Sequence, residues 1–86
     1  MSARRVLRLE LPIDSDQELA ALEGALIAAR ATERSTARRR GDRLSFGYGT
    51  DAARETMNEE IDQAQRRVAL LDRLLKALDD ASSADQ

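Results

Sequence analysis

The stretch "MNEEIDQAQRRVALLDRLLKAL", residues 57–78, determines the fold expected of this chain. Its apolar residues recur at alternating spacings of four and three over three heptads, which is the a/d pattern of a helix that packs against another helix. The pattern predicts a helix over residues 51–80, capped by Thr50 or Asp51. We call the repeating positions the C-terminal seam: Met57, Ile61, Ala64, Val68, Leu71, Leu75 and Leu78.

A covering helix is predicted over residues 15–40, and together the two helices form an antiparallel, coiled-coil-like hairpin. Ser15 and Glu18 fit a capping box at its start, and Gly41 suits the position just beyond its end. The helix offers an N-terminal seam at complementary spacing: Leu19, Leu22, Leu26, Ala29, Glu33 and Thr36. If the chain folds back at a glycine-rich turn over residues 41–50, the expected seam partners are Leu19 with Leu75, Leu22 with Leu71, Leu26 with Val68, Ala29 with Ala64 and Thr36 with Met57.

A row of arginines lies beside the N-terminal seam at Arg30, Arg34 and Arg38. The same fold-back places carboxylates opposite them, so we expect ion pairs between the helices, each worth about 0 to 1 kcal/mol when exposed. The expected partners are Asp62 or Gln63, Glu59 and Glu55, respectively.

The N-terminal residues alternate leucine with polar residues. In "RRVLRLELP", Leu7, Leu9 and Leu11 share one side, which predicts a short β-strand over residues 5–11 with one apolar face. Pro12 ends it. At the other end of the chain, residues 81–86 read as a disordered acidic tail.

A chain of 86 residues forms at most one domain, residues 1–86, and a single core of that size is marginal on its own. The hairpin also leaves apolar side chains uncovered. We therefore expect a homodimer that forms a four-helix bundle, in which the strand pairs with its own copy or with residues 44–48 of the partner. A monomer whose strand packs as an extended arm is the alternative. The residues expected to mediate self-association are Leu7, Leu9, Leu11, Ile27, Leu70 and Leu74.

The residue types present exclude several kinds of active site. The sequence has no cysteine and no histidine, which removes thiolate nucleophiles, the commonest general base and the commonest transition-metal ligand. Glu59 and Asp62 form a lone E-x-x-D pair without a matching E-x-x-E earlier in the chain. We expect a cytoplasmic, non-enzymatic protein with no cofactor, no metal and no membrane contact, acting as a protein-interaction or assembly module.

The hairpin tip carries the residues expected to contact an outside partner, which is expected to be another protein. These are Arg39, Arg40, Arg43, Phe46 and Tyr48. Arginines and aromatics are enriched where proteins meet. A cluster of three arginines with a net chain charge of −2 supports nucleic-acid binding only weakly.

The alternative is a DNA-binding regulator. The stretch "RRVLRLELPIDSDQELAALEGAL", residues 4–26, resembles the first strand and helix of ribbon-helix-helix repressors and antitoxins. The resemblance implies paired strands whose polar face enters the major groove, here Val6, Arg8 and Glu10 or the flanking Arg4 and Arg5. The helical pattern runs on through residues 30–40, however, where that family breaks its first helix.

Overall fold

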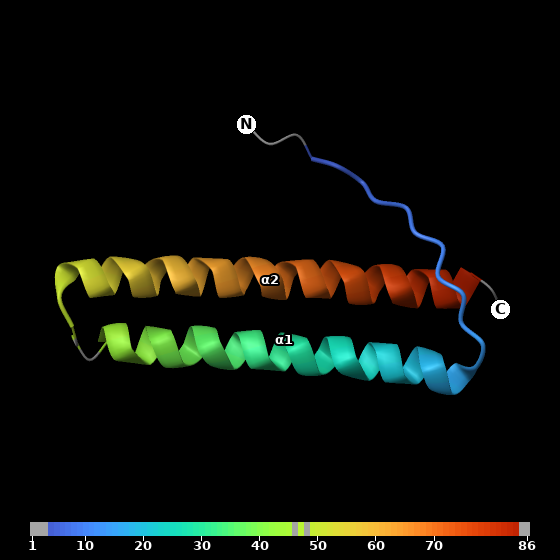
Figure 1. Ribbon diagram of the computed structural model, residues 1–86, viewed down its shortest axis with the longest axis horizontal. Helices are drawn as coiled ribbons and strands as arrows, with labels where there is room; N and C mark the ends of the chain where they lie inside the picture. The colour runs from blue at the N-terminus through green and yellow to red at the C-terminus, as the bar shows by residue number, and fades with distance from the viewer. Residues whose placement is uncertain (1–3, 46, 48, 85–86) are drawn as a thin grey trace.

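The computed structural model describes residues 4–45, 47 and 49–84. Two long helices make up most of them: α1 spans Asp16–Ser45 and α2 spans Asp51–Ala84. They lie side by side and antiparallel, joined by a short turn at one end, which we call the tip (Figure 1). The other end, where α1 begins and α2 ends, we call the base. The predicted helical hairpin is confirmed.

Side chains cap both helices at their N-termini. The hydroxyl Oγ of Ser15 accepts a hydrogen bond from the backbone N–H of Glu18 at 3.2 Å, and the Glu18 carboxylate accepts one from the N–H of Asp14 at 3.2 Å. At α2, Thr50 Oγ1 accepts from the N–H of Ala53 at 3.2 Å. The bonds from Glu18 and Ala53 satisfy backbone donors that lack partners in the first turn of a helix. The capping residues expected from the sequence, Ser15 and Thr50, are therefore confirmed.

The end of α1 differs from the sequence prediction. The helix passes through Gly41 and ends at Ser45, whereas residue 40 was the predicted end. Glycine in a helix costs only about 1 kcal/mol, and the added turn places Leu44 half-buried against the hairpin. The chain reverses instead at Gly47 and Gly49, which have positive φ values of 74° and 92°. At the other end, α2 runs four residues past the predicted end, into the segment expected to be disordered.

The C-terminal seam is confirmed. Ala64 is fully buried, and the other six seam residues are half-buried while their neighbours outside the seam are mostly exposed. The N-terminal seam is confirmed in part. Leu19, Leu22 and Leu26 are half-buried, but Ala29 is exposed and Arg30 takes its place.

Ion pairs link the two helices, as expected, but the predicted partners are wrong. Arg30 Nη1 lies 2.7 Å from Asp72 Oδ1, and Arg34 Nη2 lies 3.9 Å from the same oxygen. Each observed partner lies more than two helical turns closer to the base than the one predicted. Farther toward the tip, Arg67 Nε lies 2.9 Å from Glu33 Oε1.

Two physical causes explain this shift in register. The longer α1 moves the point of reversal toward the C-terminus. In addition, helical side chains lean toward the N-terminus of their own helix. In an antiparallel pair both leans act in the same sense, so a side chain of α1 meets one that comes from a later position of α2. Residue numbers give only the height of each Cα atom along the helix axis, and partners predicted from those heights do not include this lean.

Residues 4–15 precede α1 as an irregular segment that leaves the base of the hairpin (Figure 1). We call it the arm. None of the described residues forms a β-strand, so the strand over residues 5–11 and the dimer stay predictions. The alternative pairing with residues 44–48 of the partner also stays a prediction, and Leu44 and Ser45 are helical here, as the last residues of α1.

Candidate self-association surface

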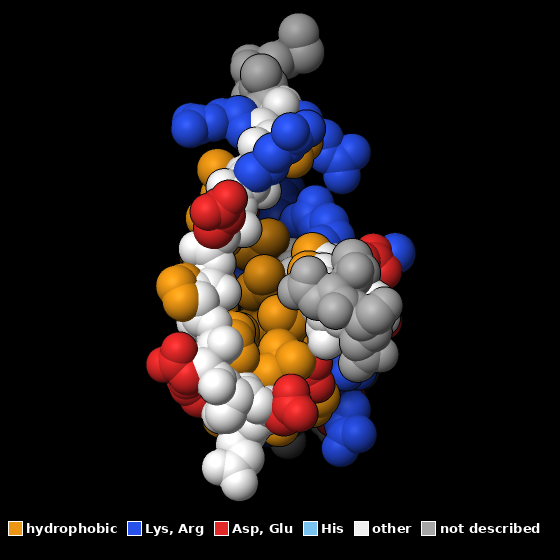
Figure 2. Space-filling model, turned by 90° about the vertical axis from the view of Figure 1, so that its right-hand side faces the viewer, with side chains coloured by type: hydrophobic (Ala, Val, Ile, Leu, Met, Phe, Trp, Pro, Cys, Tyr) orange, Lys and Arg blue, Asp and Glu red, His pale blue; other side chains and the backbone are white. Residues whose placement is uncertain are grey.

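A groove of about 640 Å³ opens at the base of the hairpin, between the arm and the ends of both helices. Figure 2, viewed from the base, shows apolar side chains gathered in a hollow with charged side chains around it. The arm supplies Leu7, Leu9, Leu11 and Ile13, α1 supplies Leu19, Leu22 and Leu26, and α2 supplies Leu74, Ala77, Leu78 and Ala81, with Asp16 and Ser82 as the polar members.

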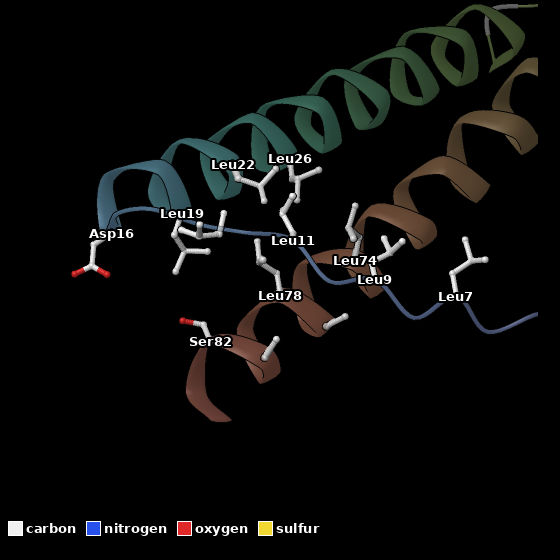
Figure 3. A pocket seen from close by; sticks show the side chains of 13 residues that line it. Leu7, Leu9, Leu11, Asp16, Leu19, Leu22, Leu26, Leu74, Leu78 and Ser82 are labelled. Carbon is white, nitrogen blue, oxygen red and sulfur yellow. The ribbon is translucent and has the colours of Figure 1, made fainter. Parts of the chain in front are cut away.

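The leucines of the arm line one wall of the groove. In Figure 3, Leu11 and Leu9 lie near Leu74 and Leu78, while Leu7 lies farther out along the arm. Three of the six residues predicted for self-association, Leu7, Leu9 and Leu11, thus meet Leu74 in one groove. The groove stays open, because Leu9 is 80% exposed and Leu11 is 61% exposed.

Ile27 and Leu70, the remaining two residues of that set, do not line the groove. They project from the helices and are about half exposed, at 49% and 56%. Neither residue belongs to the N-terminal or the C-terminal seam, so the facing helix does not cover either of them. The exposed apolar surface therefore includes the groove and positions outside it.

Sequence reasoning missed two apolar residues of the arm. Val6 is 80% exposed and Ile13 is 39% exposed and lines the groove. The alternation of the sequence places Val6 on the polar side of the predicted strand, and Ile13 follows Pro12, where that strand ends. The signal for Ile13 was present, because it continues the spacing of two shown by Leu7, Leu9 and Leu11.

The three arginines predicted at the tip line one small hollow. Arg39, Arg40 and Arg43 line it together with Thr36, and its volume is about 220 Å³. Arg40 is engaged within the chain, because its Nε lies 2.9 Å from Glu60 Oε2. Arg39 and Arg43 make no ion pair with another described residue. Phe46 and Tyr48, the aromatic members of the predicted contact set, lie outside the described residues.

The groove at the base offers apolar contacts from its lining, and the arm beside it offers backbone hydrogen bonds. Within residues 4–45, 47 and 49–84, no group of three or more acidic, histidine or cysteine side chains is arranged to hold a metal ion. In the same ranges, no helix has the length and apolar character needed to span a membrane.

Comparison of the chain with models of protein families, with curated proteins and with solved structures gave no match in any of the three.

Proposed function

We propose that this chain is a non-enzymatic assembly module that works as a homodimer, whose interface comprises the groove at the base of the hairpin together with the exposed Ile27 and Leu70. The observation that carries the proposal is the number of large apolar side chains left in water. Among the residues that the structure describes, eight have more than a third of their surface exposed: Val6, Leu7, Leu9, Leu11, Ile13, Ile27, Leu70 and Leu74.

The surface area of the isolated chain supports a partner. It exposes 7393 Å², whereas a compact monomer of 9.5 kDa exposes about 5,000 Å². The radius of gyration is 17.1 Å against about 12 Å for a compact domain of this length. A standard interface removes about 800 Å² of exposed surface from each partner. The exposed area in excess of a compact monomer is therefore large enough for one such interface.

The thin hydrophobic core supports the same proposal. Ala64 is the only fully buried apolar residue among those described. Helices in proteins gain most of their stability from the packing of an amphipathic face, and here one facing helix covers only the seam. Docking a second copy on the proposed interface would bury Leu70, Leu74 and the arm leucines, which contributes about 25 cal/mol per Å² of buried apolar surface.

Self-association is tested by sedimentation equilibrium on an Ile27→Gln, Leu70→Gln double variant. We expect the unaltered chain to be a dimer at micromolar concentration and the variant to dissociate at least tenfold more readily. Ala31→Gln with Ala52→Gln is the matched control, since both alanines are exposed on the same helices. A folded monomer of the unaltered chain at these concentrations contradicts the proposal.

The tip is proposed as the second contact surface, for an acidic protein partner. Arg39 and Arg43 are exposed and share a hollow, and arginine binds carboxylates in a bidentate manner. Poly-glutamate serves as the probe. We expect weak, salt-sensitive binding that Arg39→Gln with Arg43→Gln removes, whereas Arg4→Gln with Arg5→Gln leaves it in place.

The continuous first helix counts against the DNA-binding alternative. Ribbon-helix-helix chains break their first helix, whereas α1 is continuous through Gly24 for 30 residues. That alternative requires duplex binding that weakens steeply with salt and is lost on Arg5→Ala and Arg8→Ala. We expect neither effect.

A further inference from the structure

We infer that the arms of two copies pair as an antiparallel two-stranded ribbon in one register, with Leu9 of each chain opposite Leu9 of the other. This inference rests on the proposed homodimer and specifies how its two chains meet. The occupant of the arm's free edge is thus a second copy of the same segment, residues 4–14.

The order of charges in the arm is self-complementary about Leu9. One residue before Leu9 stands Arg8 and one residue after it stands Glu10; five before stands Arg4 and five after stands Asp14. In an antiparallel pair centred on Leu9, each of these cations lies opposite one of these anions of the other chain. A two-fold axis makes every such contact twice, and opposite charges across a strand pair are favourable.

Neighbouring registers lose this complementarity. Moving the centre by one residue sets Arg8 opposite Arg8, or Glu10 opposite Glu10, and like charges directly opposite are destabilising. A slip by half that step sets Leu9 opposite one of these charged residues, which puts apolar and polar side chains on the same face. The Leu9-centred register avoids both faults and sets Leu7 opposite Leu11.

Pro12 selects which backbone groups face the partner. Antiparallel pairs alternate between those that exchange hydrogen bonds and those that do not, and proline has no N–H to donate. If Leu9 forms a hydrogen-bonded pair, so do Leu7 and Leu11, and Pro12 falls on the outward edge, where strands tolerate it. The amides of the leucines then point at the other chain.

The placement of the arm agrees with this pairing. Leu7, Leu9 and Leu11 share the groove wall with Leu74, so the apolar side of a ribbon has leucines of the hairpin to cover. The polar side chains of the arm, Arg8 and Glu10 among them, are exposed. The other strand partner predicted from the sequence is residues 44–48 of the second chain. That segment is shortened as a strand partner, because Leu44 and Ser45 belong to α1.

Single cysteine variants test the register, since the chain has no cysteine of its own. Leu9→Cys places two thiols across the two-fold axis, within the Cα separation of about 4.4 to 6.8 Å that a disulfide needs. Leu7→Cys and Leu11→Cys are matched controls, because each puts the two copies of the altered residue about 13 Å apart. Under mild oxidation at micromolar concentration, we expect Leu9→Cys to form disulfide-linked dimers at least tenfold faster than either control.

The outcomes separate this inference from the homodimer itself. Faster linkage through Leu7→Cys or Leu11→Cys assigns a different register, and equal linkage at all three positions assigns a parallel pair; either result overturns the inference. A chain that sediments as a dimer but links at none of the three does not pair its arms, and the proposed homodimer then stands without the ribbon. A monomer contradicts both.

Charge reversal provides a second test that leaves the leucines intact. Arg8→Glu sets two pairs of like charges in the ribbon, as does Glu10→Arg, so each variant is expected to dimerise roughly tenfold more weakly. Combining both changes in one chain restores opposite charges, and mixing the two single variants does so in a heterodimer. We expect the strength of dimerisation to recover in both cases. Absence of recovery in both overturns the Leu9-centred register.

Discussion

Ala64 shows at the scale of one residue how closely the two helices approach. It is fully buried in the middle of the C-terminal seam, and alanine is the smallest side chain in that row. The sequence identified the seam because every member follows the spacing of four and three. It could not identify the partner of each residue, because side-chain lean and the true end of α1 set the register.

We expect Ala64→Leu to lower the free energy of unfolding by about 1 to 3 kcal/mol, since the added methylenes have no space between the helices. Ala29→Leu is the control, because Ala29 is exposed on α1 and its change should be within about 0.5 kcal/mol. Urea denaturation followed by circular dichroism measures both. Equal effects of the two substitutions would contradict the close approach at Ala64.

At the scale of the element, glycine has opposite roles in the helix and in the turn. The sequence predicted a helix end at Gly41 because glycine often follows a helix, but the local preference is weak against the packing of Leu44. The glycines that end α1 are those with positive φ, Gly47 and Gly49. Both candidate stop positions carry the same residue type, so composition alone cannot distinguish them.

Exchanging a helical glycine, Gly24, and a turn glycine, Gly49, for alanine is expected to change the stability of the protein in opposite directions. Gly24→Ala should stabilise the protein by about 0.5 to 1 kcal/mol, because the site is helical and nothing lies within 4 Å of the added Cβ. Gly49→Ala should destabilise it by at least about 1 kcal/mol, since φ is 92° and the new Cβ lies 3.3 Å from Ala53 Cβ. Thermal unfolding compares the two variants, and stabilisation by Gly49→Ala would contradict the turn described here.

At the scale of the whole molecule, the hairpin and the arm together form an elongated body of 53 × 32 × 15 Å. Alternating leucines indicated that the arm has an apolar side, and the structure places that side in a groove. Whether the arm becomes a strand depends on hydrogen bonds from a second chain. The sequence pattern of one chain supplies only one of the two edges that a strand pair needs.

The proposed dimer makes stability depend on concentration. We expect the thermal unfolding midpoint to rise by several degrees between about 1 and 100 μM protein, because association favours the folded dimer by mass action. The Ile27→Gln, Leu70→Gln variant should show a smaller rise. A midpoint that is constant over this range for the unaltered chain would show that folding is unimolecular.

The base gathers the start of α1, the end of α2 and the arm at one end of the hairpin (Figure 1). Two copies that meet there bring the last helical turn of one close to the arm of the other. A tandem gene joining two copies through a short glycine-serine linker should therefore yield a single-chain version whose melting no longer varies with dilution, because the linker holds both halves at a high effective concentration.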